Sequence, residues 1–347
     1  MQGKEASEQE TKGKSSAGID VSKSWLDVHV VPAGATLRVA NTRDGIRKLK
    51  RWLMQFDLGL VVIEATGKWH RDVRRSLHAA GIAVAVVDPF RVRMFAKACG
   101  VLAKTDRVDA RVLAQFAAVM APTVRAPAPQ AMEELAELVT ARASAVAEET
   151  ALKNQLSAAI TPFLKRQLGR RIERIGKDIG ALEREILRCI HADPGLARRY
   201  DILISVTGFG PVVAMTLIAC LAELGTCSRK QISMLAGLAP VADESGERQG
   251  VRVVWGGRPN VRRILYLAAI TAARCNPDMK AFFDRLTADG KAAKLAIIAV
   301  ARKLVVLANT LISDNRTWQP HSPKYACHVS LRFRILHSHG GPDLAAG

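Results

Sequence analysis

The sequence predicts an α/β domain with a mixed sheet followed by a mostly helical region, so the fold class is α/β plus all-α. Strand and helix signals alternate over residues 17–120. Charged sequence with helical periodicity fills residues 131–192, and short helices around a glycine-rich patch fill residues 201–315. A chain of 347 residues is long enough for two or three domains with cores of their own.

Four apolar runs rich in Val and Ile are expected to be strands: residues 17–31, 36–41, 58–66 and 82–89. Four segments with helical periodicity are expected to be helices: residues 42–56, 68–81, 91–100 and 106–120. The order strand, strand, helix, strand, helix, strand, helix indicates one mixed sheet with helices packed on it.

A linker and a helical arm are expected over residues 121–200. Proline punctuation marks residues 121–130 as the linker, and Thr161-Pro162 is expected to divide the arm into two helices. One face of the second helix carries apolar residues at alternating spacings of three and four: Ile172, Ile175, Ile179, Leu182 and Ile186. This rhythm is typical of a coiled-coil seam. An antiparallel hairpin that packs on itself and an oligomerisation arm both fit it.

A third domain is expected over residues 201–318, closed by a long amphipathic helix at 291–312. The uncharged segment 202–222 is long enough for a membrane span, but Gly208-Phe209-Gly210-Pro211 divides it, so two short apolar helices fit better. Residues 1–16 are interpreted as a polar, disordered leader without the apolar core of a signal peptide, and residues 319–347 as a tail.

The chain carries 51 Lys and Arg against 32 Asp and Glu, a formal net charge of +19. Such an excess favours a polyanionic partner, above all nucleic acid, although ribosome-associated and membrane-surface proteins are equally basic. Six scattered cysteines without a C-x-x-C pair exclude a zinc finger or a disulfide framework, and indicate reduced thiols in a cytoplasmic protein. Aromatic residues are 5% of the chain, too few for a stacking platform as the main binding device.

Four carboxylates are candidate metal ligands. Asp20 lies on the first strand, Glu64 ends a buried strand, and Asp106 and Asp109 share one face at a helix start. Singly, each has a structural explanation, such as a turn cap, a helix N-terminal acid or a surface ion pair. Together, at one edge of an α/β sheet, their hard oxygen donors suit Mg²⁺ (or Mn²⁺). Asp27 is not expected to be a fifth ligand, because it is expected at the far end of the first strand.

One serine, Ser245, precedes a cluster of arginines: Arg248, Arg252, Arg258, Arg262, Arg263 and Arg274. Arginine forks bind phosphate and stabilise the charge that develops when a nucleophile attacks a phosphodiester. Gly246 and the Gly256-Gly257 pair are expected to let backbone approach the serine. By composition alone Ser245 is a turn residue in a basic patch. The candidate nucleic-acid contacts are Lys104, which is close to Asp106, and five of these arginines: Arg248, Arg252, Arg258, Arg262 and Arg263.

The stretches "GIDVSK", "VVIEATG" and "KTDRVDARVLA" resemble the DEDD-type transposases of bacterial insertion sequences, the IS-one-ten family. The stretches "ISVTGFGPVVAMTLIACLAEL" and "LAPVADESGERQGVRVVWGGRPNVRRILY" resemble that family's second conserved domain. The resemblance covers about residues 17–318. It implies an N-terminal RuvC-like domain with the RNase H fold, whose acidic quartet maps onto Asp20, Glu64, Asp106 and Asp109. It also implies a helix-hairpin-helix-like start to the C-terminal transposase domain.

The same resemblance implies that Ser245 attacks DNA beside the metal-bearing quartet, either of its own chain or of another subunit. The expected function is therefore that of a transposase or site-specific recombinase of an insertion sequence. Double-stranded DNA, a structured guide RNA encoded by the element and further copies of the chain (a dimer or tetramer) are the implied partners, at the bacterial nucleoid. Two alternatives remain: a metal-dependent junction-resolving nuclease that needs no serine, and a non-enzymatic nucleic-acid-binding protein.

Overall fold

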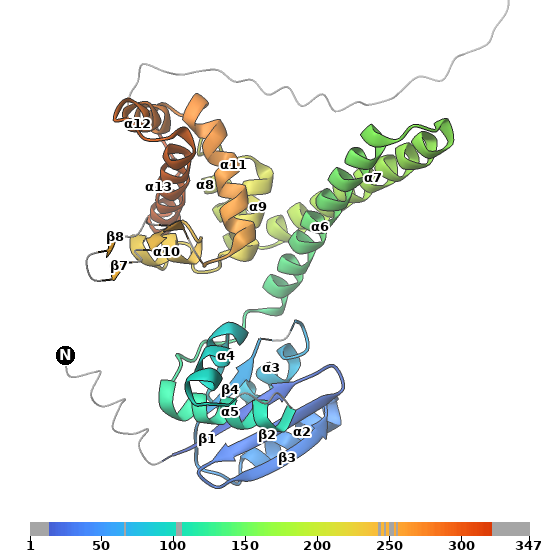
Figure 1. Ribbon diagram of the computed structural model, residues 1–347, viewed down its shortest axis with the longest axis vertical. Coiled ribbons are helices and arrows are strands. Elements are labelled where there is room, and N and C mark those ends of the chain that lie inside the picture. Colours follow the sequence, from blue (N-terminus) through green and yellow to red (C-terminus); the bar gives the residue numbers. More distant parts are fainter. Residues whose placement is uncertain are drawn as a thin grey trace, which may run out of the picture. The chain divides into compact units, whose positions relative to one another are not determined.

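The computed structural model describes residues 14–65, 67–101, 106–241, 244–245, 248–249, 253–254 and 256–320, and only the backbone of the described residues within 106–108 and 241–253. These residues form two compact units that divide after Pro129 (Figure 1). The first unit holds a mixed sheet and the second is mostly helical, which confirms the predicted fold class at that level. The three-part domain division stays a prediction.

Five strands form the sheet of the first unit: β1 (Ser15–Val21), β2 (Trp25–Val31), β3 (Ala35–Ala40), β4 (Leu58–Glu64) and β5 (Val84–Val87). Their order across the sheet is β3-β2-β1-β4-β5. The hairpin partners β1, β2 and β3 are antiparallel, whereas β1, β4 and β5 are parallel. The parallel strands therefore end at one common edge of the sheet.

The single strand predicted over 17–31 is wrong, because the chain turns at 22–24 and forms the β1–β2 hairpin instead. The Ser22 hydroxyl closes this turn: it donates to the Trp25 carbonyl at 3.0 Å and accepts from the Trp25 amide at 2.9 Å. Serine side chains favour such local turns over a continuous strand. The predicted leader also ends too late, since Ser16 already pairs with Val31.

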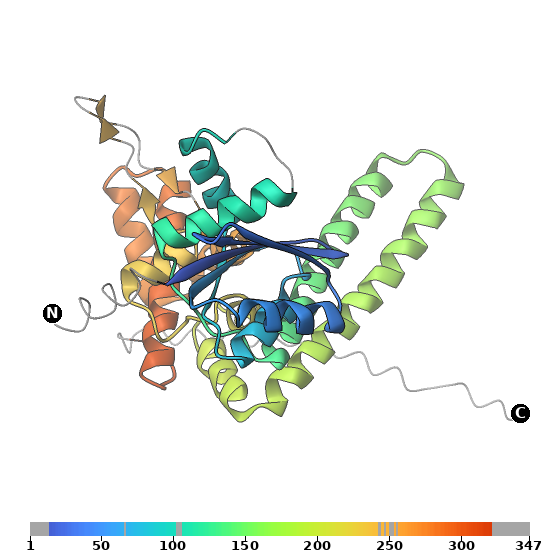
Figure 2. The ribbon, with the colours of Figure 1, turned by 90° about the horizontal axis from the view of Figure 1, so that it is seen from below.

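Helices cover both faces of this sheet (Figure 2). One face is covered by α2 (Arg43–Leu53) and α3 (Arg71–Ala79), whose apolar side chains share a core with β1 and β2. The other face is covered by α4 (Pro89–Ala98) and α5 (Asp106–Met120), which pack on β4 and β5 through a second core. Both faces of β1 and β4 are therefore buried, as their continuous apolar sequence requires.

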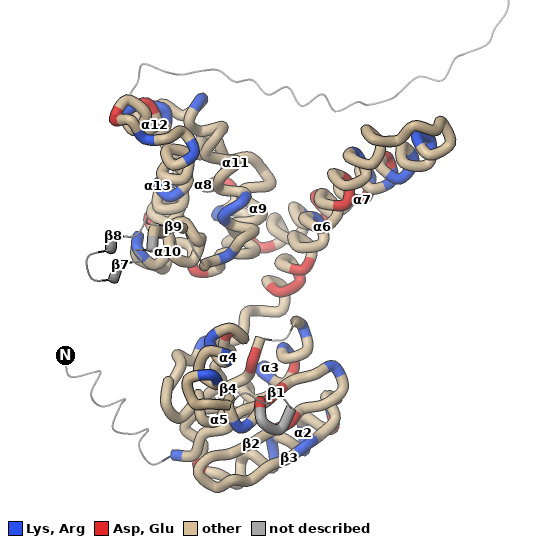
Figure 3. The backbone as a smooth tube through the Cα atoms, in the orientation of Figure 1, with Lys and Arg blue, Asp and Glu red and all other residues tan. Residues whose placement is uncertain are grey.

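The helical arm is an antiparallel hairpin of α6 (Gln130–Ala158) and α7 (Pro162–Ala192) in the second unit. The predicted break is confirmed, since the Thr161 hydroxyl caps α7 by accepting from the Leu164 amide. Arg142 on α6 donates to Glu183 on α7 at 2.7 Å. The sequence of α6 holds five glutamates and two cations, and that of α7 holds eight Lys or Arg and four acids. Figure 3 shows charges of both signs along the arm. Oligomerisation through this arm stays a prediction.

The remaining helices of the second unit form one core with the base of the arm: α8 (Pro194–Ile204), α9 (Pro211–Cys220), α10 (Arg229–Leu235), α11 (Pro259–Cys275), α12 (Pro277–Ala288) and α13 (Ala293–Ser313). The apolar segment 202–222 is interrupted between α8 and α9, as predicted. Among the described helices, α13 alone is long and apolar enough to cross a membrane, and half of it is buried in this core. The core helix of a folded domain can be equally long and apolar, and the buried side chains of α13 show that it has this role here.

Candidate functional site

Two of the predicted acids end neighbouring parallel strands. The register pairs Gly18 with Val62 and Ile19 with Ile63, so Asp20 and Glu64 are the next positions on β1 and β4. Side chains alternate between the faces of a sheet, and residues paired in register share a face. Asp20 and Glu64 thus lie side by side, half-buried, at the carboxyl edge of the sheet.

The helix that carries the other two acids sits directly on β1. A Cβ added to Gly18 would lie 2.3 Å from the Ala110 carbonyl oxygen and 2.3 Å from the Ala114 amide nitrogen of α5. Only glycine permits this close approach of two backbones. Gly18 is two residues before Asp20 and so faces the same way, and Ala110 directly follows Asp109. The first turn of α5 therefore begins beside the strand edge that carries Asp20.

The donor set is suited to a hard divalent cation, since carboxylate oxygens from adjoining elements face one edge of the sheet. Among the described side chains, however, no group of three His, Cys, Asp or Glu lies close enough together to hold a metal ion. The side chain of Asp106 lies outside the described residues, as does all of Lys104. Asp20, Glu64 and Asp109 thus lie on the adjoining elements β1, β4 and α5, but their described side chains do not form a metal site.

Asp27 belongs to this edge, and placing it at the far end of the first strand is wrong. The β1–β2 register pairs Asp27 directly with Asp20, and the β2–β3 register pairs it with Arg38. Asp27 is only 6% exposed, and its Oδ1 lies 3.7 Å from an Arg38 guanidinium nitrogen. Directly opposite residues of antiparallel strands have Cβ atoms about 5 Å apart. The sequence signal that was missed is the Ser22 turn, which folds Asp27 back onto Asp20.

His29 lies one pair further along the same face, opposite Gly18. Partial burial lowers the pKa of its imidazole, and the positive charge of Arg111 on α5 lowers that pKa further. His29 is therefore neutral at physiological pH and adds no charge to the row formed by Glu64, Asp20 and Asp27.

The serine loop consists of two small two-stranded ladders. β6 (Pro240–Val241) pairs with β9 (Val253–Val254), and β7 (Glu244–Ser245) pairs with β8 (Arg248–Gln249). Ser245 is directly opposite Arg248, so the nucleophile candidate and one arginine are cross-strand neighbours. Their side chains, and the whole of Arg252, lie outside the described residues.

Arg258, at the start of α11, is engaged within the protein. Its two terminal nitrogens each donate to a carboxylate oxygen of Glu223 at 2.7 Å, and one also donates to the Cys220 carbonyl at 2.9 Å. Donating these hydrogen bonds to Glu223 raises the pKa of the Arg258 guanidinium. The phosphate contact expected of Arg258 would therefore have to displace a bidentate carboxylate.

Arg262 also has hydrogen-bond partners within the protein. It donates to the carbonyl of Gly256 at 2.9 Å and to the carbonyl of Gly237 at 3.3 Å. A Cβ on Gly257 would lie 2.2 Å from the Gly237 nitrogen. The Gly256-Gly257 turn thus packs against Gly237, at the end of α10, whereas the sequence suggested an approach to the serine. The exposed Arg263 is a better placed candidate for a nucleic-acid contact.

Comparisons with known proteins match both units. Residues 17–163 match a model of DEDD-type IS110 transposases, and residues 200–284 match a model described as "Transposase IS116/IS110/IS902 family". A pilin gene-inverting protein of Moraxella bovis is 24% identical over 314 residues, which span 87% of this chain and 97% of that protein. The insertion element IS110 43.6 kDa protein of Streptomyces coelicolor is 23% identical over 88% of this chain and 96% of its own length.

These matches cover the acidic strand edge of the first unit and the serine loop of the second, in the order that the sequence resemblance implied. A transposase acts on DNA, which agrees with the net charge of +19. The chain therefore belongs to the IS116/IS110/IS902 family of transposases, and is a DNA transposase or recombinase.

Proposed function

We propose that this transposase cuts and rejoins DNA with Ser245 as the nucleophile, assisted by a metal-binding quartet of Asp20, Glu64, Asp106 and Asp109. The observation that carries the proposal is the seating of α5 on Gly18, because it brings the helix of Asp109 to the strand edge of Asp20 and Glu64. The strand order β3-β2-β1-β4-β5 with helices on both faces supports a RuvC-like fold for this unit.

The serine step conserves the phosphodiester. The Ser245 Oγ loses its proton and forms a bond to phosphorus, while the bond from phosphorus to the departing strand breaks and that strand's oxygen takes up a proton. Arg248, opposite Ser245 in the hairpin, is placed to stabilise the charge that builds on the phosphate oxygens. Reversal by a second strand's hydroxyl rejoins DNA without another energy source.

Mg²⁺ or Mn²⁺ bound by the acids would polarise the phosphate as a Lewis acid. The chain's own part is to hold the carboxylates in place. Asp27 is paired in register with Asp20 and with Arg38, and its carboxylate lies 3.7 Å from the Arg38 guanidinium, so its proposed role is that of a positioning residue beside Asp20. Outer partners of this kind tune metal sites through the ligands they orient.

The remaining parts of the proposal extend the family relationship. A structured RNA from the element selects donor and target DNA, and the chain works as a dimer or tetramer at the nucleoid. The exposed apolar side chains at the tip of the arm, Ile160 (88% exposed) and Phe163 (64% exposed), support a role for the arm in assembly.

The test is capture of a denaturation-resistant protein–DNA adduct in the presence of Mg²⁺, using full-length protein and its element DNA. Ser245→Ala is expected to abolish the adduct and strand exchange, and Ser157→Ala, an exposed serine on α6, to retain both. Cleavage by Ser245→Ala at a near-normal rate would instead establish a junction-resolving nuclease. Unchanged activity in Asp20→Asn and Glu64→Gln would leave a nucleic-acid-binding protein without metal chemistry.

A further inference from the structure

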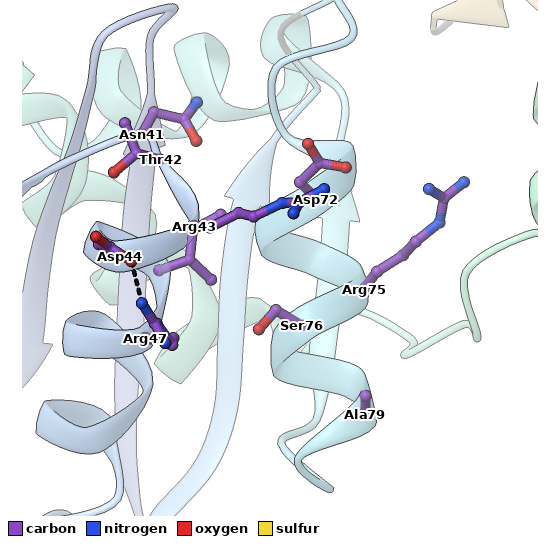
Figure 4. Close-up of a pocket in the computed structure, with 10 residues that line it drawn as sticks. Asn41, Thr42, Arg43, Asp44, Arg47, Asp72, Arg75, Ser76 and Ala79 are labelled. Atoms are coloured by element: carbon purple, nitrogen blue, oxygen red, sulfur yellow. Dashed lines mark hydrogen bonds and ion pairs between the residues drawn. The ribbon is translucent and has the colours of Figure 1, made fainter.

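A groove of about 770 Å³ lies between α2 and α3, on the face of the first unit's sheet opposite α5 (Figure 4). Arg43 and Arg47 line it from α2, one helical turn apart, and Arg75 and Ser76 line it from α3. Figure 4 shows Arg43 reaching across toward Asp72, and Arg47 turned back to Asp44. Nothing in the chemistry proposed for the acids or for Ser245 uses this groove.

The surroundings of the groove are strongly basic. Together α2 and α3 carry eight Lys or Arg against two Asp: Arg43, Arg47, Lys48, Lys50, Arg51, Arg71, Arg74 and Arg75. The hydrogen bond from Arg47 lowers the pKa of Asp44, so that carboxyl stays ionised. The pair is nevertheless exposed to solvent, which screens its attraction, so an incoming phosphate can compete for Arg47.

The groove fits the backbone of a nucleic acid better than its bases. Its lining contains three arginines, two hydroxyls, an amide and the two carboxylates of Asp44 and Asp72, but no aromatic ring. Guanidinium groups bind phosphate oxygens bidentately, whereas single strands and RNA loops are bound mainly by stacking of their bases on aromatic side chains. A paired backbone, whose bases are already stacked, is therefore the favoured occupant.

The position of the groove links it to the acidic edge. Its rim begins at Asn41, which directly follows β3 and whose side-chain amide donates to the Ser22 carbonyl at 2.9 Å and to the Trp69 carbonyl at 3.2 Å. Ser22 opens the turn that follows Asp20 on β1. The rim of the groove and the acids thus share one edge of the sheet.

We propose that the groove between α2 and α3 binds the sugar–phosphate backbone of duplex DNA that flanks the reacting phosphate. Arg43 and Arg47 each contact phosphate oxygens from one side, with Arg75 on the opposite rim. The inference goes beyond the serine and acid chemistry and does not depend on it, because it concerns binding alone.

The test compares two double variants of the full chain that remove the same charge from the same helix. Arg43→Gln/Arg47→Gln removes the groove arginines, and Lys48→Gln/Arg51→Gln removes two cations of α2 that do not line the groove. Fluorescence anisotropy with labelled duplex DNA over a salt series gives affinity and the salt slope. The groove variant is expected to bind about 10-fold more weakly near 0.1 M salt, with the slope of log K against log salt reduced by about 2.

The control variant is expected to lose less than about 3-fold, through general electrostatics only. Equal losses in both variants, or none in the groove variant, would overturn the proposal. So would a groove variant that keeps its DNA affinity while losing affinity for an RNA hairpin of equal length, since the occupant would then be RNA. Because anisotropy measures binding without strand cleavage, a failure of this inference is distinguishable from a failure of the serine chemistry.

Discussion

Replacing Gly18 by alanine tests whether the seating of α5 positions the acids. The added methyl group would meet two backbone atoms of α5 at 2.3 Å and the Leu113 Cβ at 2.6 Å. Ordinary contact begins at 3.4 Å, so α5 has to withdraw from β1 by about 1 Å. Backbone atoms cannot rotate away as a side chain can, and Leu113 is fully buried. The displacement therefore carries the first turn of α5, with Asp109, away from Asp20.

Two effects of this displacement can be measured. Overpacking of this kind costs about 1–3 kcal/mol of unfolding free energy, which urea titration of the purified protein detects. A misplacement of about 1 Å at a reacting centre can lower the rate by about 100-fold. The rate of adduct formation per folded molecule should fall by that order in Gly18→Ala.

Gly59→Ala is the matched control, since Gly59 lies on the neighbouring strand β4 of the same sheet. Its added Cβ would lie 3.0 Å from the Lys14 Cβ, and the exposed Lys14 can shift. We expect a loss below about 1 kcal/mol and a normal rate. Gly18→Ala with stability within about 0.5 kcal/mol of the parent would contradict the backbone contact. Reduced stability with an unchanged rate of adduct formation would show that the position of α5 on β1 does not control the acids.

Three further predictions follow from single contacts. Glu223→Gln is expected to cost about 1–2 kcal/mol in urea unfolding, because Arg258 loses its carboxylate while about a third of its side chain remains exposed; a gain in DNA affinity at no stability cost would instead make Arg258 a phosphate ligand. His29→Asn is expected to flatten the loss of stability between pH 7.5 and 5.5, because the lowered pKa of His29 makes the unfolded chain bind more protons below about 6.5; identical pH profiles would refute this. Asp27→Asn is expected to weaken Mn²⁺ binding by about 10-fold with little change in fold, which Mn²⁺ titration followed by electron paramagnetic resonance measures; unchanged affinity would remove Asp27 from the site.

Local sequence was sufficient to predict most of the helices and strands. Val and Ile runs predicted the buried strands, and the Gly and Pro positions predicted the breaks, as at Thr161-Pro162 and between α8 and α9. These signals act over a few residues, so they can be read without the fold. The error over 17–31 has the same origin. The turn signal of one serine, Ser22, is weak beside the strand propensity of the Val and Ile residues on both sides of it.

The sequence by itself determined the family, the fold class and the chemical character of the site: acids at strand ends, a serine among arginines and a strongly basic chain. Only the tertiary structure decided which residues meet. Strand register placed Asp27 against Asp20, and packing gave Arg258 a partner, Glu223, 35 residues earlier in the chain. The groove between α2 and α3 likewise exists only because both helices bury their apolar faces on one side of the sheet. Such pairings depend on contacts between distant segments, and local composition does not encode them.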